Sequence, residues 1–205
     1  MTQYGFYFDA TRCTGCKTCE IACRDYNDLD LDFSYRHVYE IEGGDWSENA
    51  DGTWSTDGYT YYTSISCQHC DNPACMHVCP TGAMHKDDNG VVRVDEKRCI
   101  GCGYCAMACP YGNPKVDRTK GHSVKCDGCA SRVAEGKNPI CVEACSMRAL
   151  EFGPVESLPQ GDGRAAVAPL PDPEVTSPNL YIKNCAQAQP CGSLECRVAN
   201  EAEVK

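Results

Sequence analysis

Cysteine is the residue type whose number and spacing in this chain point most directly to chemistry. Nineteen cysteines occur among 205 residues, and sixteen of them form four groups of four. Groups one and three share the spacing C-x2-C-x2-C-x3-C and comprise Cys13, Cys16, Cys19 and Cys23, and Cys99, Cys102, Cys105 and Cys109. Groups two and four are spaced C-x2-C-x4-C-x3-C and C-x2-C-x11-C-x3-C and comprise Cys67, Cys70, Cys75 and Cys79, and Cys126, Cys129, Cys141 and Cys145.

These spacings suit the ligation of cubane iron–sulfur clusters. A [4Fe–4S] cluster needs four thiolates around it. A C-x2-C-x2-C loop wraps three of them around one cluster, and small residues such as Gly15 and Gly101 allow the backbone to approach closely. The fourth cysteine begins a helix that leads away, so it ligates the neighbouring cluster, as in bacterial two-cluster ferredoxins. We therefore predict four clusters, all [4Fe–4S], in an electron-transfer protein.

Two other uses of cysteine compete with this interpretation. A cysteine content of about 9% is also typical of disulfide scaffolds, but an odd number prevents complete pairing within the chain. Zinc ribbons use two cysteine pairs separated by a loop, and group four taken alone has that form. A zinc-dependent interaction module therefore stays open as an alternative, which iron and sulfide analysis would test.

The overall composition narrows the possible partners and reactions. The formal net charge is −10, and we expect no nucleic-acid binding because phosphate affinity comes from Lys and Arg. The sequence has no run of 18 apolar residues, so we expect no transmembrane helix. The opening MTQYGF lacks the pattern of a secretory signal, so we expect folding in a reducing cytoplasm. The sequence contains no recognisable nucleophile–base pair, phosphate-binding loop or open metal site. It therefore predicts electron transfer rather than catalysis of bond formation or cleavage.

Short elements must position the cysteine groups. Alternation of residue types predicts a strand over 4–9, and a helix over 18–26 carries the last two cysteines of group one. We also expect a strand at 91–95 and short helices at 106–109 and 140–144.

Two longer segments lie outside the cysteine groups. Gly-Gly and Asp-Gly turns within 36–66 predict a surface β-ribbon. We expect its aromatic residues, Trp46 and Trp54 among them, to pack over the cluster domain or in an interface. Six prolines in 154–178 predict an extended arm lying against a partner, with a solvated linker as the alternative.

Five segments give the chain a resemblance to the iron–sulfur subunits of the dimethyl sulfoxide reductase family of molybdoenzymes. They are RCTGCKTCEIAC (12–23), YEIEGGDW (39–46), SISCQHCDNPACMHVCPTGAMHK (64–86), CIGCGYCAMACPYG (99–112) and KCDGCASRVAEGKNPICVEAC (125–145). Weaker similarity extends through VAPLP (167–171) and PNLYIK (178–183).

The resemblance implies an α+β fold of two bacterial-type dicluster ferredoxin-like units, one inserted in the other. The expected divisions are an outer unit, a β-ribbon insertion, an inner unit and an extended C-terminal arm, at 1–35 with 112–155, 36–63, 64–111 and 156–205. Group one then pairs with group four, and group two with group three. The implied ligand sets are Cys13, Cys16, Cys19 with Cys145; Cys126, Cys129, Cys141 with Cys23; Cys99, Cys102, Cys105 with Cys79; and Cys67, Cys70, Cys75 with Cys109.

The resemblance also implies partners. The group-one cluster would face a molybdopterin-containing catalytic subunit, and the group-two cluster a membrane anchor that oxidises quinol. Such subunits are exported already folded with the catalytic subunit, to the extracytoplasmic face of the membrane. A soluble molybdopterin or hydrogenase-type complex, including a cytoplasmic one, is the alternative. The related nitrate reductase subunit has Trp in place of Cys102 and holds a three-iron cluster, so four irons are expected here.

Four residues depart from the cysteine pattern. Cys185, Cys191 and Cys196 have no cubane spacing. We expect them to be free thiols or to form a disulfide after export, with a metal site shared with a partner as the alternative. Ser146 replaces the proline expected after group four.

Several charged residues lie close to the cysteine groups in sequence. Lys17, Lys86, Arg98 and Lys125 are candidates for raising cluster potentials, with ordinary surface charge as the alternative. His85 could lie close to the quinone side, although a capping or surface histidine is the simpler interpretation.

Overall fold

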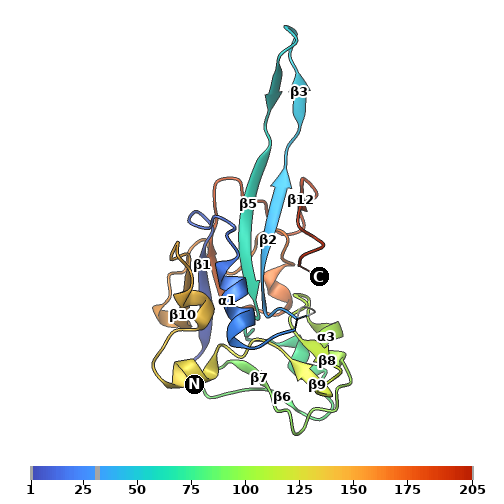
Figure 1. Cartoon of the computed structure of the whole chain (residues 1–205), viewed down its shortest axis with the longest axis vertical. Coiled ribbons are helices and arrows are strands. Elements are labelled where there is room, and N and C mark those ends of the chain that lie inside the picture. Colours follow the sequence, from blue (N-terminus) through green and yellow to red (C-terminus); the bar gives the residue numbers. More distant parts are fainter. Residues whose placement is uncertain (1, 31–32, 205) are drawn as a thin grey trace.

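The first of two three-stranded sheets joins distant parts of the chain. The structure is a computed structural model that describes residues 2–30 and 33–204. Strand β1 (Tyr4–Asp9) pairs antiparallel with β10 (Leu150–Pro154) and parallel with β11 (Leu180–Lys183). This sheet therefore brings the beginning, the later middle and the end of the chain together (Figure 1).

The second sheet forms the predicted β-ribbon. Strand β2 (Arg36–Gly43) pairs antiparallel along its whole length with β5 (Tyr59–Ser66), and β12 (Cys196–Val198) pairs with the end of β2. Between β2 and β5, the strands β3 (Trp46–Glu48) and β4 (Trp54–Thr56) form a two-stranded hairpin. Figure 1 shows this hairpin projecting beyond the rest of the molecule.

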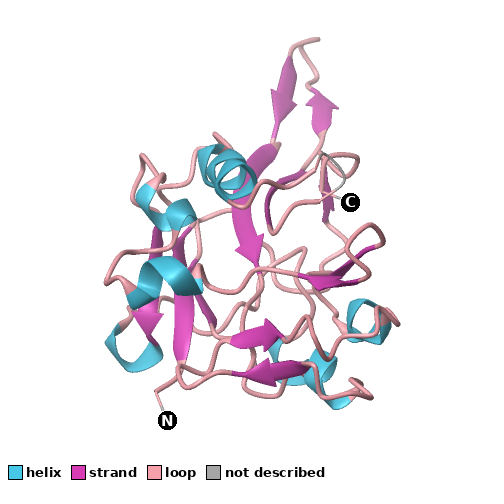
Figure 2. Cartoon of the chain, turned by 60° about the horizontal axis from the view of Figure 1, so that its bottom comes forward, coloured by secondary structure: helices cyan, strands magenta, loops and turns pink. Residues whose placement is uncertain are grey.

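The remaining elements are short. Two further hairpins comprise β6 (Met84–Lys86) with β7 (Val92–Val94), and β8 (Lys115–Asp117) with β9 (His122–Val124). The helices are α1 (Thr18–Tyr26), α2 (Ala74–His77), α3 (Tyr104–Ala108), α4 (Ala130–Ala134) and α5 (Ile140–Glu143), with 3-10 turns η1 (Val155–Ser157) and η2 (Pro173–Val175). Figure 2 shows these short helices set among strands and long loops.

The sequence located most of these elements. The predicted strand over 4–9 and helix over 18–26 have the expected bounds. The strand expected at 91–95 is one residue shorter at each end, and the helix expected at 140–144 ends one residue earlier. The helix expected at 106–109 begins at Tyr104, because Gly103 at φ +79° turns the chain directly into it.

The larger hydrophobic core lies between the two main sheets. Apolar side chains of β1, β2, β5, β10 and β11 meet there, including Phe8 and Ile41, both at 0% exposure. Residues from the proline-rich segment, such as Val167 and Leu170, are buried in the same core. This segment covers the chain's own core and continues into β11, so it is not a solvated linker, and its contact with a partner stays a prediction.

A smaller core lies under groups two and three. Its buried members are Cys75, Met84, Val92 and Cys105. Two of these four are predicted cluster ligands, so apolar packing contributes less here than in the larger core.

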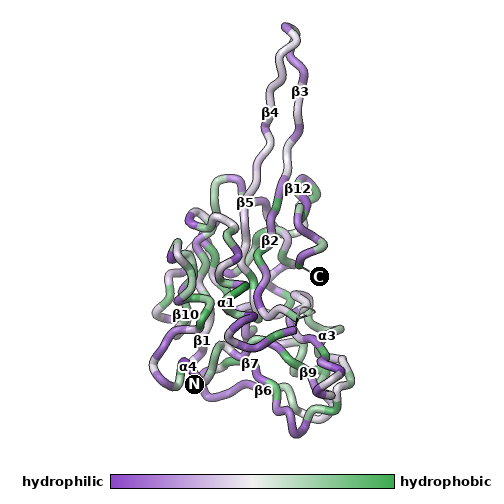
Figure 3. Tube along the Cα trace, viewed as in Figure 1, coloured by the Kyte–Doolittle hydropathy of each residue, from purple (hydrophilic) through white to green (hydrophobic). Residues whose placement is uncertain are grey.

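The tryptophans of the β3–β4 hairpin lie away from the cluster domain, and their packing in an interface stays a prediction. Trp46 and Trp54 are 68% and 59% exposed, so they do not pack over the cluster domain. Figure 3 shows mainly hydrophilic and neutral colours along this hairpin, with the apolar positions concentrated below it. Among the residues that the structure describes, no helix has the length and apolar character needed to cross a membrane.

Candidate cluster-binding site

The structure gathers the cysteines into the sets that the resemblance implied; each set is named here after the group that supplies three of its members. Three separate cavities are each lined by four cysteines. The group-one cavity is lined by Cys13, Cys16, Cys19 and Cys145. The group-two cavity is lined by Cys67, Cys70, Cys75 and Cys109. The group-three cavity is lined by Cys99, Cys102, Cys105 and Cys79.

The group-four set is assembled where helices α1 and α5 meet. Cys23 lies close enough to Cys129 and Cys141 for their charges to interact, and Cys126 interacts in the same way with Cys23. Cys23 comes from α1 and Cys141 from α5, while Cys126 and Cys129 lie between β9 and α4. Each predicted set therefore has its members together, while cluster ligation by these sixteen residues stays a prediction.

All four loops share one backbone feature. The second residue between the first two cysteines of each group has a left-handed φ, at Gly15 (+67°), His69 (+44°), Gly101 (+66°) and Gly128 (+70°). A side chain at Gly15 would place its Cβ 2.4 Å from the Tyr62 ring. This turn aims backbone N–H groups at sulfur, as the 3.4 Å bond from the Gly128 N–H to Cys126 Sγ shows.

His69 takes a position that is glycine in the other three loops. Its side chain is 1% exposed, its Nδ1 accepts the N–H of Val92 at 3.1 Å, and its ring stacks on Phe6. Its carbonyl accepts the side-chain amides of Gln3 and Asn179. These contacts offset the cost of a left-handed non-glycine residue. Alignment of the four C-x2-C segments would have revealed this substitution.

Several ligand sulfurs accept additional hydrogen bonds. Backbone N–H groups approach Cys79, Cys99 and Cys145 at 3.5, 3.3 and 3.3 Å. The Ser64 hydroxyl lies 3.3 Å from Cys19 Sγ and can donate to it, whereas the Cys105 thiol donates to Ser123 Oγ at 3.3 Å. Hydrogen-bond donors to sulfur stabilise thiolate charge and adjust cluster potentials.

Burial controls the protonation of the cysteines. It raises the pKa of the Cys23, Cys70 and Cys75 thiols to about 12. Such thiols are protonated at neutral pH, so metal binding must release their protons. At the surface, hydrogen bonds from Thr18 lower the pKa of Cys16, and Ser146 contributes a further bond. The serine that departs from the expected proline thus contacts a predicted ligand.

The group-two cavity contains a polar group suited to a cluster. Gln68 lines this cavity and is 2% exposed. Neither its Nε2 nor its Oε1 has a hydrogen-bond partner among the described residues. Buried amides are normally satisfied, and a cluster sulfide would give the Nε2 hydrogens an acceptor. The cysteine donors and this amide both fit an iron–sulfur cluster.

The four sets form a row through the chain. The group-one cavity adjoins the group-four set, because Cys19 and Cys23 lie about one turn apart on α1. Cys126 of the group-four set interacts in turn with Cys67 of the group-two set. Strand β7 lines both the group-two and the group-three cavities. The order along the row is therefore group one, group four, group two, group three.

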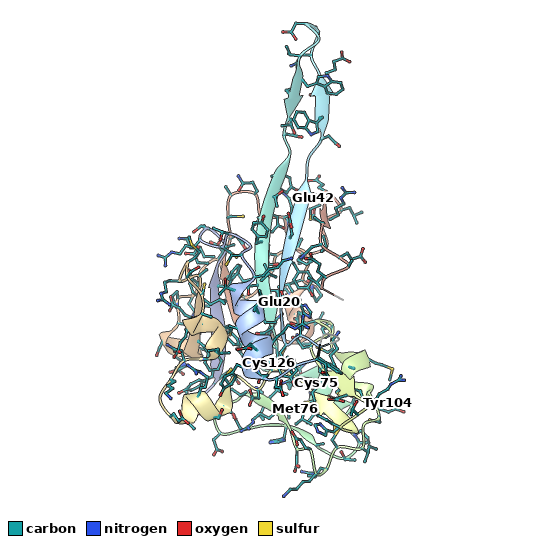
Figure 4. The ribbon with its side chains drawn as sticks, in the orientation of Figure 1. Glu20, Glu42, Cys75, Met76, Tyr104 and Cys126 are labelled. Carbon is teal, nitrogen blue, oxygen red and sulfur yellow. The ribbon has the colours of Figure 1, made fainter. Side chains whose placement is uncertain are left out.

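This order changes one expectation. The resemblance predicts that the group-two set lies at the end that faces a membrane anchor. It lies inside the row instead, because it packs beside Cys126, and the group-three set takes the end. The two exposed cysteines among the described residues, Cys16 and Cys102, belong to the two terminal sets. Figure 4 shows Cys126 and Cys75 near the middle of the body and Tyr104 at its outer edge.

The four basic residues that are candidates for raising cluster potentials differ in burial. Lys17 and Lys86 form ion pairs with Glu203 and Asp71 and are partly exposed. Arg98 donates to the Thr81 carbonyl at the surface. Lys125 alone among the four is buried.

The remaining candidates have simple surroundings. His85 lies on β6, and its Nδ1 is 3.0 Å from the Ala83 carbonyl oxygen. Cys185 and Cys196 are half-buried near the Tyr61 hydroxyl. Both are free thiols, as is Cys191.

Comparison with known proteins identifies the kind of site. A family model described as a 4Fe-4S dicluster domain matches residues 59–155, and a second with the same description matches 12–83. The chain is 57% identical to the B subunit of the anaerobic dimethyl sulfoxide reductase of Escherichia coli, covering 99% of each protein. It is 54% identical to the corresponding B subunit of Haemophilus influenzae, covering 100% of each. It is 41% identical to the thiosulfate reductase electron transfer subunit PhsB of Salmonella typhi, over 74% of this chain and 76% of that one. The α+β fold with two ferredoxin-like dicluster units is confirmed.

Proposed function

Since the chain belongs to the iron–sulfur electron-transfer subunits of the dimethyl sulfoxide reductase type, we propose that it relays electrons from a quinol-oxidising membrane anchor to a molybdopterin-containing catalytic subunit. Four [4Fe–4S] clusters, ligated by the sixteen cysteines of the four sets, are the proposed carriers. A cluster held by four thiolates exchanges one electron at a potential set by its charge, hydrogen bonds and burial.

The observation that carries this proposal is the row of four cysteine sets with an exposed cysteine at each end. Its inner members are enclosed, as the burial of Cys126 and Cys67 illustrates. Its terminal sets reach the surface at Cys16 and Cys102. A relay needs both properties, because the interior must keep water from the carriers while each end must come close to a partner.

We assign the group-three end to the membrane anchor. Ile100, Tyr104 and Met107 are 65%, 52% and 75% exposed beside Cys102. A cluster of large exposed apolar side chains around a cofactor cavity is typical of an interaction surface. An anchor subunit embedded in lipid is a suitable partner for it.

The β3–β4 hairpin is assigned to the catalytic subunit. Trp46 pairs with Thr56 and Trp54 with Glu48, so both tryptophans lie on one face, while Ser47 and Ser55 pair on the other. The segment 44–58 contains four acidic residues and no basic one, so a basic groove is the complementary partner surface. Strand β5, which follows the β3–β4 hairpin, contacts the group-one loop, because the Tyr62 ring packs on Gly15.

Location follows from these partners. We propose a membrane-associated complex at the extracytoplasmic face, reached by export together with the folded catalytic subunit. Labelling of exposed lysines in intact cells and in membrane vesicles of inverted orientation would locate the complex.

Metal analysis of the purified chain tests the cluster content. About sixteen irons and as many acid-labile sulfides per chain are expected from four cubanes. Zinc without sulfide would contradict the proposal and favour the zinc-dependent module.

Affinity purification from membranes solubilised in mild detergent tests the partners. A molybdenum-containing subunit and a membrane protein should copurify with the chain. Recovery of the molybdenum subunit from the soluble fraction, with no membrane protein, would favour the soluble complex.

A further inference from the structure

Two cations are buried among the cysteine sets. Arg36 is 1% exposed and Lys125 is 6% exposed, and no other Lys or Arg within residues 2–30 and 33–204 is buried. No carboxylate in that part of the chain forms an ion pair with either of them. A buried charge without a counter-charge is strongly destabilising, so the protein requires a source of negative charge at these positions.

Arg36 lies between the group-one and group-four sets. The groups around it that would become negative as thiolate ligands are Cys141, Cys19, Cys126 and Cys23. Its guanidinium donates to the Ser64 carbonyl and hydroxyl, both at 3.0 Å, and stacks 4.8 Å above the Phe6 ring.

A hydrogen-bond chain links Arg36 to a predicted ligand. Because Ser64 Oγ accepts from Arg36, its own proton is free to be donated to Cys19 Sγ, 3.3 Å away. The guanidinium therefore acts on the group-one set both through space and through this hydroxyl.

Lys125 occupies the equivalent place at the next junction of the row. Its Nζ donates to the carbonyls of Cys126 and Val92 and hydrogen-bonds to Cys67. The thiols that face it belong to the group-four set through Cys126 and to the group-two set through Cys67 and Cys75.

We infer that Arg36 and Lys125 are buried counter-cations that raise the reduction potentials of the clusters they separate, so that neighbouring carriers in the row accept electrons without strong mutual repulsion. This inference rests on the proposed function. The chain itself has a net charge of −10, and each oxidised cubane with its four thiolates adds roughly −2. Charge added to one cluster disfavours reduction of the next, and a cation between them opposes that repulsion with little screening by solvent.

The position of the cations predicts which clusters respond. Arg36 faces the group-one and group-four sets, and Lys125 faces the group-four and group-two sets. Neither has a thiol of the group-three set among the main charges that act on it. The group-three cluster is therefore an internal reference.

Redox titration of the cluster-loaded chain, within the complex with which it purifies and followed by electron paramagnetic resonance, tests the inference. Arg36→Gln should shift the midpoint potentials of the group-one and group-four clusters to lower values. Lys125→Gln should do the same for the group-four and group-two clusters. The group-three potential should be unchanged in both variants.

Two variants serve as controls for charge near the row. Lys17 lines the group-one cavity but is paired with Glu203 at the surface, and Lys86 is paired with Asp71. Lys17→Gln and Lys86→Gln should shift midpoint potentials much less than the buried substitutions, because solvent and the paired carboxylates already screen these charges.

Unchanged midpoint potentials in Arg36→Gln and Lys125→Gln, at full iron content, would overturn the inference and leave the proposed function intact. A wild-type chain without about sixteen irons would instead defeat the proposed function. If the glutamine variants fail to assemble clusters, Arg36→Lys and Lys125→Arg should restore iron content and near-normal potentials. Failure of the charge-conserving variants to do so would show that shape, not charge, is what these residues provide.

Discussion

The part of the chain around groups one and four and the part around groups two and three hold their cysteines by different means. The first has the three-stranded β10–β1–β11 sheet and the larger core, in which Phe6, Phe8 and Leu150 are buried. The second has the two-stranded β6–β7 hairpin, two helices of four and five residues, and a buried core in which half of the members are cysteines. Small units with so little apolar packing usually depend on a metal or a disulfide. The comparison indicates that the second part folds largely around its clusters.

Removal of iron should have the largest effect, and it should affect the two parts of the chain differently. Chelation of the reduced chain is expected to abolish the hydrogen-exchange protection of residues 84–94, where β6 and β7 lie, while β1 and β10 keep part of theirs. Exchange measured by mass spectrometry on loaded and cluster-free chains would check this. Uniform loss of protection across both parts would contradict it.

Substitutions in the two cores should also differ in how their effect on stability depends on the clusters. Phe8→Ala removes a fully buried ring and is expected to lower the free energy of unfolding by about 3–5 kcal/mol, with or without clusters. Met84→Ala is expected to lower it by about 2–5 kcal/mol only in the loaded chain, because its surroundings are already unfolded without iron. Denaturant titrations of both variants in both states would check this. An equal effect of Met84→Ala in the cluster-free chain would argue against dependence on the clusters.

The two exposed cysteines allow a matched test of the row's ends. Cys102→Ser should leave the group-three cluster with three irons and stall electron flow from quinol. Cys16→Ser should change the group-one cluster and leave the group-three signal intact. Electron paramagnetic resonance distinguishes three-iron from four-iron clusters, and an unchanged four-cluster spectrum in either variant would refute that ligand assignment.

The smallest effect on stability is expected at the β3–β4 hairpin. Replacing Trp46 and Trp54 with Ala should change the free energy of unfolding by less than about 0.5 kcal/mol, because both side chains are exposed. The same variant should bind the catalytic subunit more weakly, as pull-down yield would show. Ser47→Ala and Ser55→Ala on the opposite face form the control. Equal binding by the tryptophan variant would remove the hairpin from the proposed interface.

The amino-acid sequence by itself determined the local chemistry of the site. The cysteine spacing predicted the four loops, and the elements at 4–9 and 18–26 have the bounds that the pattern indicated. These features depend on residues near one another along the chain, so local spacing is enough to predict them. The pairing of groups came from the resemblance to a family, because spacing alone does not say which fourth cysteine crosses to which loop.

Only the tertiary structure decided the order of the row and the residues between its members. Arg36 stands among polar and aromatic residues, and its burial follows only when β2 pairs with β5 and covers it. The proline-rich segment resembles a free arm until β11 adds to β1. The group-two set lies inside the row because Cys67 meets Cys126, 59 positions further along the chain. Each of these outcomes depends on contacts between segments that are distant along the chain. Local sequence patterns do not predict the free energy of such contacts.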